Sequence, residues 1–172
     1  MSSPPYKPKI FSDPLPPYAP RPGVAVLIVK CTKQVLLARR AFDPHKGMLD
    51  LPGGFVDPSE SAEDAVKREI REETGLKVVG LEYIGSIPDV YGPTTTPTLN
   101  LVFVAHVEDA DPRAKDDVAS LEWFPLDELP PRSEMAFEHH ETALKWCQEY
   151  CHRKQAGICG VGKQGKSPTQ PA

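Results

Sequence analysis

One stretch of the sequence, from Gly54 to Leu76, constrains the fold more than any other. It reads GFVDPSESAEDAVKREIREETGL, a glycine-led loop followed by a segment of helical character. Apolar residues recur at every fourth position of that segment: Ala62, Val66 and Ile70. This periodicity predicts an amphipathic helix, from about Ser59 to Thr74, that packs on a sheet. Gly75 stands where a helix commonly ends in a left-handed glycine.

Three acids of the predicted helix, Glu69, Glu72 and Glu73, share one face, because positions i, i+3 and i+4 are neighbours on a helix. Like charges at this spacing repel, and hard cations such as Mg²⁺ or Mn²⁺ prefer oxygen ligands. Mg²⁺ is typically shared between carboxylates and substrate phosphates. The face therefore indicates a place where metal ions hold a phosphate chain. The alternative is a solvated helix, on which Arg68 pairs with Glu72.

The same stretch resembles the Nudix box, GX5EX7REUXEEXGU with U a bulky aliphatic residue, at every fixed position. The chain is thus similar to the Nudix hydrolases, which cleave a diphosphate linking a nucleoside to another group. The resemblance implies an α/β fold, namely an α/β/α sandwich with a mixed β-sheet. It implies Mg²⁺ or Mn²⁺ as cofactor, held by Gly53 (through its carbonyl), Glu69, Glu72 and Glu73. It further implies catalytic roles for Glu72 and Glu73, and structural roles for Gly54, Glu60 and Arg68, the last two as a brace between helix and loop.

A base outside the box often assists in this family. The segment DDVASLEWFPLDELP, from Asp116 to Pro130, is similar to a family segment in which an acid precedes a Trp-Phe or Trp-Tyr pair by about six residues. In that register the acid is Asp117. A solvated turn at Asp116 and Asp117 is the alternative, and Glu122 is a further candidate.

The substrate is less closely defined by the sequence. Within the family the chain most resembles the Nudix domain of NADH pyrophosphatases, over roughly residues 18 to 130, through YAPRPGVAVLIV, LPGGFVDPSES and SLEWFPLDELPP. That subgroup's SQPWPFP motif is replaced here by SIPDVYG, which ends at Gly92. The family marker for ADP-ribose is a proline about sixteen residues after the box, and the marker for diadenosine polyphosphates is a tyrosine slightly beyond it. Both are absent here, because Gly92 and Pro93 occupy those places. NADH or NAD, ADP-ribose, or a similar dinucleotide or nucleotide sugar remain the predicted substrates.

Three residues outside the box are predicted to contact the substrate. Tyr91 is the large aromatic of a predicted loop from Asp89 to Thr98, and a nucleotide base can stack on it. Phe42 is a second aromatic candidate, and Arg40 stands at a strand end where it can contact phosphate. Core packing for the aromatic residues and solvation for Arg40 are the alternatives.

Two competing functions come from other classes. One is a Nudix module that binds a nucleotide as a sensor without cleaving it, against which the intact acids of the box argue. The other is an isomerase of isoprenoid diphosphates with a related fold, whose Cys and Glu pair is not evident in this sequence.

Length and composition set the frame for these hypotheses. With 172 residues the chain has room for one domain with tails. We expect a proline-rich arm at 1–20, a Nudix hydrolase domain at 21–156 and a disordered tail at 157–172. Strands are expected at 23–30, 34–40, 77–87, 99–107 and 121–124, and a last helix at 137–154.

The formal net charge of −4 gives no broad basic face for duplex nucleic acid, so the predicted partner is a small nucleoside diphosphate derivative. No run of 18 apolar residues predicts a membrane span, and the N-terminus lacks an apolar signal region, so a cytoplasmic location is expected. A homodimer is left open. Cys147 and Cys151 are spaced for a metal pair, but reduced cysteines on a helix are the favoured interpretation.

Overall fold

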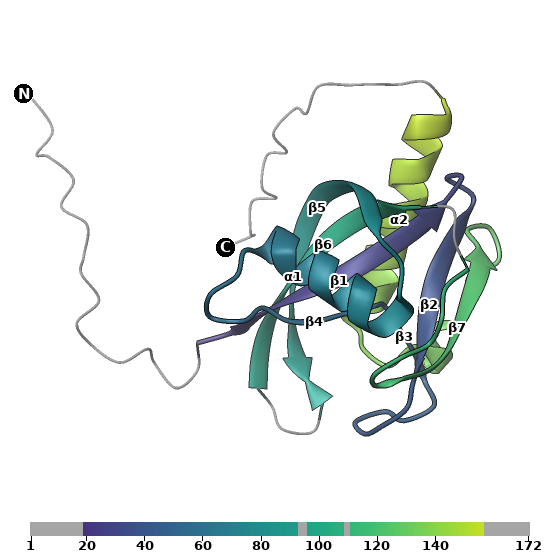
Figure 1. The fold of residues 1–172 in the computed structure, drawn as a ribbon. Helices are drawn as coiled ribbons and strands as arrows, with labels where there is room; N and C mark the ends of the chain where they lie inside the picture. Colours follow the sequence, from purple (N-terminus) through teal and green to yellow (C-terminus); the bar gives the residue numbers. More distant parts are fainter. Residues whose placement is uncertain (1–18, 93–95, 109–110, 157–172) are drawn as a thin grey trace, which may run out of the picture.

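The computed structural model describes residues 19–92, 96–108 and 111–156, and these form a mixed sheet with a helix on each face (Figure 1). The central strand β1 (Arg21–Lys30) pairs in parallel with β6 (Thr96–Val107) and antiparallel with β2 (Gln34–Arg40). The predicted α/β sandwich with a mixed sheet is confirmed, and the first two expected strands, at 23–30 and 34–40, correspond to β1 and β2. The expected arm lies outside the described residues except for its last two positions, and the expected tail lies outside them entirely.

The remaining strands extend this sheet on both sides. The path is β3-β2-β1-β6-β5, with β4 paired to β1 and β7 paired to β2. Their bounds are β3 (Leu49–Asp50), β4 (Gly53–Phe55), β5 (Val78–Tyr91) and β7 (Val118–Pro125). β4 begins with two glycines: Gly53 and Gly54 pair with Ala25 and Val24 of β1.

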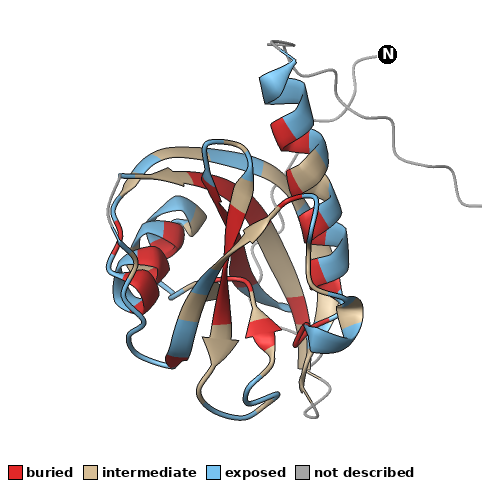
Figure 2. Cartoon of the chain, turned by 90° about the vertical axis from the view of Figure 1, so that its right-hand side faces the viewer, coloured by how far each residue is buried: buried red, intermediate tan, exposed pale blue. Residues whose placement is uncertain are grey.

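The apolar run of β1 is buried on both faces because each face packs under a different helix. Leu27 and Val29 belong to the core beneath α2 (His139–Gln155), whereas Val26 and Ile28 belong to the core beneath α1 (Ala62–Glu69). In Figure 2 buried residues lie along the central strands and along one side of each helix. The predicted last helix is confirmed, and its apolar side faces the sheet.

The predicted helix of the box is divided in two. Ser61 caps α1 by accepting a hydrogen bond from the backbone N–H of Asp64. After Glu69 the chain continues as a π-helical turn, η1 (Ile70–Thr74), which ends at Gly75 with a φ of 72°. A uniform α-helix to Thr74 was therefore the wrong expectation. Such π-turns occur often at functional sites, and this one contains two of the predicted metal ligands.

The predicted loop from Asp89 to Thr98 is mostly strand. β5 and β6 form a long antiparallel hairpin in which Asp89 faces Thr98 and Tyr91 faces Thr96. Prolines suggested a loop, but both lie within paired strands. Pro88 is in the edge strand β5, which tolerates proline, and Pro97 is in β6 just before its pairing with β1 begins at Thr98. The consequence is that Asp89 and Tyr91 are held on the sheet. No helix among the described residues is long and apolar enough to cross a membrane.

Candidate active site

Two glycines let the box helix approach the sheet closely. A Cβ on Gly53 would lie 2.1 Å from the carbonyl oxygen of Val24, and one on Gly54 would lie 2.3 Å from Oε1 of Glu69. The backbone N–H of Gly53 donates a hydrogen bond of 3.0 Å to Oε2 of Glu73. Side chains at these positions would therefore push apart β1, β4 and the acids of the box.

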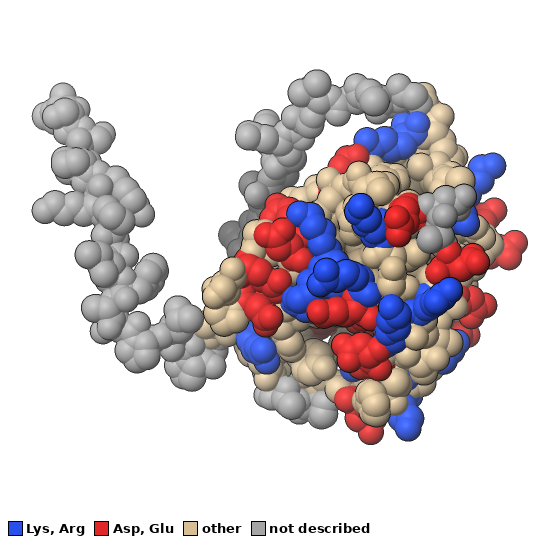
Figure 3. Space-filling view, in the orientation of Figure 1, with Lys and Arg blue, Asp and Glu red and all other residues tan. Residues whose placement is uncertain are grey.

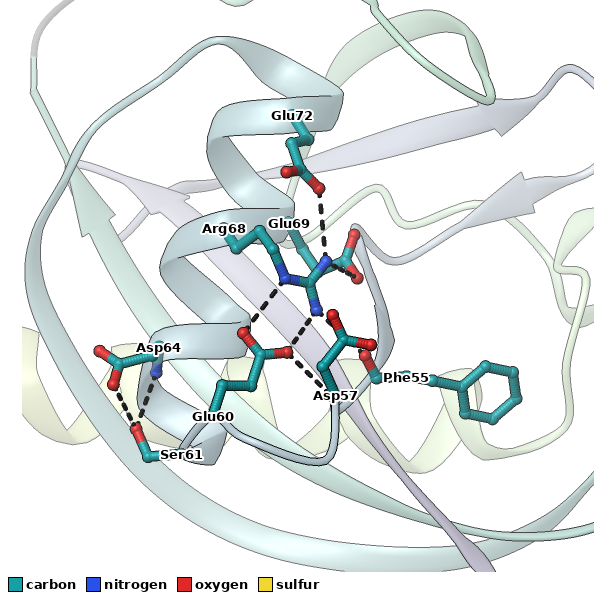
Figure 4. A network of polar contacts seen from close by, with 8 residues as sticks. All are labelled: Phe55, Asp57, Glu60, Ser61, Asp64, Arg68, Glu69 and Glu72. Carbon is teal, nitrogen blue, oxygen red and sulfur yellow. Dashed lines mark hydrogen bonds and ion pairs between the residues drawn. The ribbon is translucent and has the colours of Figure 1, made fainter.

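Arg68 joins the helix to the loop before it (Figure 4). Its guanidinium lies 2.6 Å from Oε1 and 3.1 Å from Oε2 of Glu60, and it also donates to the carbonyl of Phe55 at 3.1 Å. On its other side it donates to Glu69 at 2.7 Å and to Glu72 at 3.3 Å. The hydrogen bonds to Glu60 contribute most to raising the Arg68 pKa, so this cation is permanent. One side chain thus fixes both the loop and two acids.

The three acids of the box occupy different environments. Glu73 is 5% exposed and Glu69 is 9% exposed, whereas the Glu72 side chain is 42% exposed. Burial, followed by the nearby charges of Glu69 and Asp117, raises the pKa of Glu73 well above its ordinary value. Burial also raises the pKa of Glu69 despite its bond to Arg68. The π-turn has therefore sent one acid inward and left its neighbour at the surface.

Asp117 lies beside this group. Burial and the adjacent Asp116 raise its pKa, and its charge in turn raises the pKa of Glu69 and Glu73. The predicted catalytic base is thus close enough to the acids of the box to interact with them electrostatically. Glu122, the other candidate, is exposed on β7.

A cavity of about 300 Å³ opens beside these acids. Its acidic wall consists of Glu69, Glu72, Glu73, Asp116 and Asp117, together with Arg68. Figure 3 shows acidic and basic side chains intermingled on the face of the molecule that presents α1.

A second wall of the cavity is aromatic. Tyr91 and Phe137 are stacked with centroids 5.6 Å apart, and Phe55 meets Tyr91 edge-on at 5.3 Å. Arg40 lies over Phe137 at 5.4 Å. Rings from three segments distant in sequence thus form one apolar surface.

Two His–Asp pairs complete the aromatic wall. Nδ1 of His139 lies 2.6 Å from Asp89, and Nε2 of His140 lies 3.1 Å from Asp50. Asp50 also accepts from Arg40 at 2.5 Å. Although burial opposes ionisation of Asp50, the hydrogen bonds from His140 and Arg40 lower its pKa.

A family model of the NUDIX domain matches residues 19–147 of the sequence. The chain belongs to the NUDIX family. It is a pyrophosphohydrolase of that family, as its box predicts. The match runs from the start of the described β1 region into α2, so it includes both walls of the cavity.

Named relatives of this Nudix hydrolase include an ADP-ribose pyrophosphatase and NAD-capped RNA hydrolases. ADP-ribose pyrophosphatase of Methanocaldococcus jannaschii is 40% identical over 131 residues, which cover 73% of this chain and 75% of the relative. NAD-capped RNA hydrolase NudC of Actinobacillus succinogenes is 34% identical over 134 residues, which cover 72% of this chain. The matched region spans only about half of the NudC relatives, 49% in that case.

Solved structures agree with the fold. The MutT NUDIX hydrolase of Burkholderia pseudomallei has a TM-score of 0.63 at 30% identity, with 74% of this chain and 98% of that chain covered. The NUDIX domain of Shewanella oneidensis NrtR, solved with ADP ribose, has a TM-score of 0.62 at 22% identity, over 84% of this chain and 93% of that one. The second likeness shows the fold alone.

The predicted site residues of this Nudix hydrolase are largely brought together. The cavity is lined by Gly53, Gly54, Arg68, Glu69, Glu72, Glu73, Asp117, Arg40 and Tyr91, while Glu60 stands behind Arg68. Phe42, by contrast, is 63% exposed and does not line the cavity, so its contact with the substrate stays a prediction. Arg40 lines the cavity but is already bonded to Asp50 and to the carbonyl of Pro44.

Several lining residues were missed by the sequence interpretation: Asp50, Asp89, Phe137, His139 and His140. Consecutive histidines at the start of an expected helix were a visible signal. Nothing in the local pattern, however, connects them with acids of β3 and β5.

Nudix hydrolases generally use divalent metal ions, and the donor chemistry of the acidic wall fits such an ion. Its carboxylates are crowded and partly buried, and their mutual repulsion is compensated only on one side, by Arg68. Within the described ranges no three His, Cys, Asp or Glu side chains stand as a ready metal cluster. Arg68 draws Glu69 and Glu72 toward itself, whereas Glu73 bonds to the backbone of Gly53.

Proposed function

We propose that this Nudix hydrolase cleaves the diphosphate of ADP-ribose or of a similarly compact nucleoside diphosphate derivative. The observation that supports this most is the single cavity that joins the acidic wall of α1 and η1 to the aromatic wall of β5 and the start of α2. A substrate with a diphosphate beside a ring-bearing group matches both walls at once. The relative named ADP-ribose pyrophosphatase, 40% identical, supports the same choice.

Mg²⁺, with Mn²⁺ as a substitute, is the proposed cofactor. Glu69, Glu72, Glu73 and the carbonyl of Gly53 would hold it. When bound, such an ion neutralises diphosphate charge and lowers the pKa of a coordinated water. The protein's own contribution is positioning, which dominates phosphoryl transfer because little covalent help is needed.

The remaining residues of the acidic wall have supporting roles in this proposal. Arg68, fixed by Glu60 and by the carbonyl of Phe55, keeps Glu69 and Glu72 oriented at the mouth of the cavity. Asp117 is the proposed base, because burial raises its pKa toward the range in which a carboxylate takes a proton from water.

Cavity size favours a compact substrate. About 300 Å³ is at the lower end of ligand pockets, which run from roughly 300 to 1,000 Å³. ADP-ribose carries one heterocyclic base, whereas a dinucleotide such as NADH carries two. The absence of the SQPWPFP motif is consistent with this choice.

The test is a substrate panel of ADP-ribose, NADH, NAD, a nucleotide sugar, a diadenosine polyphosphate and an NAD-capped RNA. Hydrolysis is followed by phosphatase-coupled release of inorganic phosphate or, for the RNA, by its change of mobility. We expect the highest kcat/KM for ADP-ribose, loss of activity with chelator and recovery with Mg²⁺. Preference for NADH or capped RNA would overturn the substrate proposal. Tight binding of ADP-ribose without any turnover would instead support the sensor alternative.

A further inference from the structure

His139 is a buried histidine of the cavity wall for which the acids of the box give no role. It begins α2, it is 8% exposed, and it lines the same cavity as those acids. Its ring lies nearly parallel to that of Phe137 at a centroid distance of 5.8 Å, and Phe137 is stacked on Tyr91. His139 is therefore the polar end of a column of three rings.

Asp89 fixes the orientation of this ring. One of its oxygens lies 2.6 Å from Nδ1 of His139 and also accepts the backbone N–H of His139 at 3.3 Å. Its other oxygen accepts the backbone N–H of Val90 at 2.7 Å. Three donors from β5 and α2 thus hold the carboxylate, and the carboxylate holds the imidazole.

The protonation of the ring follows from these partners. Although burial opposes ionisation of Asp89, its bonds to His139 and Val90 lower its pKa, so it is a carboxylate at neutral pH. Burial and the neighbouring His140 lower the pKa of His139 to about 4, so the imidazole is neutral. Because an ionised carboxylate only accepts hydrogen bonds, the proton lies on Nδ1, and Nε2 presents a lone pair.

Nε2 of His139 is not used by the protein itself, as far as the described residues go. None of them makes a hydrogen bond to it, and the only fully buried side-chain nitrogen or oxygen without a partner among them is Nδ1 of His140. Nε2 is therefore reachable from solvent, in a ring that lines the cavity.

Neighbouring groups leave Nε2 as the open acceptor of this wall. The carboxylates of Asp89 and Asp50 are already bonded, the latter to Arg40 and His140. The cation closest to the column, Arg40, is held by Asp50 and the carbonyl of Pro44. A phosphate gains nothing from an unprotonated nitrogen, whereas a neutral N–H or O–H donor does.

We propose that His139 is a specificity-determining residue whose Nε2 accepts a hydrogen bond from a donor on the ring-bearing end of the substrate, either a purine amine or a ribose hydroxyl. This inference rests on the proposed function and extends it. A site built to accept a hydrogen bond discriminates against an analogue without the donor, because the bound analogue shuts the acceptor off from water and leaves it unpaired. Asp89 is the positioning residue that keeps the acceptor on Nε2.

The kinetic test compares the wild type with His139→Asn. Asn keeps an N–H donor near the place of Nδ1, so Asp89 retains a partner, while the Nε2 edge is removed. His152→Asn, on the exposed side of the same helix, is the matched control. Substrates are ADP-ribose, its hypoxanthine analogue (purine amine replaced by an oxygen) and analogues lacking single ribose hydroxyls.

We expect His139→Asn to raise KM for ADP-ribose about ten-fold with kcat nearly unchanged, the scale of one neutral hydrogen bond. The wild type should show a similar loss with one analogue, and on that analogue the variant should lose nothing further. A loss confined to the hypoxanthine analogue identifies the amine, and one confined to a deoxy analogue identifies the hydroxyl. Equal losses on every substrate, or no loss at all, would overturn the inference while ADP-ribose hydrolysis by the wild type still stands. A wild type inactive on ADP-ribose refutes the proposed substrate and with it this extension.

A second readout does not depend on turnover. Nitrogen-15 NMR of the wild-type imidazoles, with His139 assigned by its absence in His139→Asn, reports which nitrogen bears the proton. We expect a protonated Nδ1 and a bare Nε2 at neutral pH. A proton on Nε2 would refute the acceptor role.

Discussion

Glu73→Gln should make the protein more stable and far less active. Glu73 is 5% exposed, and its carboxylate faces the charges of Glu69 and Asp117 with one backbone N–H, that of Gly53, as its hydrogen-bond partner. Gln keeps an oxygen that accepts from Gly53 and removes the charge. Removing a buried charge that lacks compensating partners should raise the free energy of unfolding by about 1–3 kcal/mol. For a domain of this size that corresponds to a rise in melting temperature of about 3–10 °C.

The pH dependence has a definite sign. Burial and neighbouring acids raise the folded-state pKa of Glu73 above its unfolded value. Its protonated form therefore stabilises the fold at low pH, and that stability is lost as the pH rises through the raised pKa. The advantage of Glu73→Gln over the wild type should be small near pH 5 and largest near pH 8. Activity should fall by a factor of roughly hundreds, as expected when an electrostatic contribution to the transition state is removed.

The assay is a thermal melt in chelator at pH 5 and pH 8, combined with kcat on ADP-ribose in Mg²⁺. Glu72→Gln is the informative control, since that side chain is 42% exposed and pairs with Arg68. It should lose activity to a similar degree without gaining stability. Glu63→Gln, on the exposed side of α1, should change neither. A Glu73→Gln variant that melts below the wild type at pH 8 would refute the argument that this acid is held at a cost in stability.

Three further outcomes follow from the structure. Arg68→Met should cost more activity than Glu60→Gln, because Arg68 also holds Glu69 and Glu72; equal losses in kcat would contradict its role as the shared brace. Tyr91→Ala should both raise KM and lower the melting temperature, since Tyr91 is stacked on Phe137; an unchanged melting temperature would show that this packing is unimportant. Between pH 8 and pH 5 the wild type should lose about 2 kcal/mol of stability relative to His139→Asn. The reason is that His139 has a pKa of about 4 in the fold and 6.5 in the unfolded chain, so it binds its proton mainly when unfolded. Parallel pH curves for the two proteins in denaturant titrations would contradict this.

Local spacing explains how far the sequence interpretation reached. Ser61 and Gly75 delimit the box helix through contacts within four residues of themselves, and such contacts are visible in a sequence. The strand expected at 23–30 is likewise a local apolar run, and it corresponds to β1. The sequence predicted a loop where β5 and β6 pair, because proline locally favours loops. The pairing with Thr96 and Thr98 that makes this segment a strand is not visible in the local pattern.

The sequence by itself determined the family, the reaction class and the acids of the box, because fixed spacing along one helix is enough to bring those side chains together. Only the tertiary structure decided which acid is buried, since the π-turn and the backbone of Gly53 draw Glu73 inward and leave Glu72 outside. Only the fold, likewise, brings Asp89 to His139, 50 residues away. The physical reason is that burial, and the pKa values and hydrogen bonds that follow from it, arises from contacts between segments far apart in the chain, which no local pattern records.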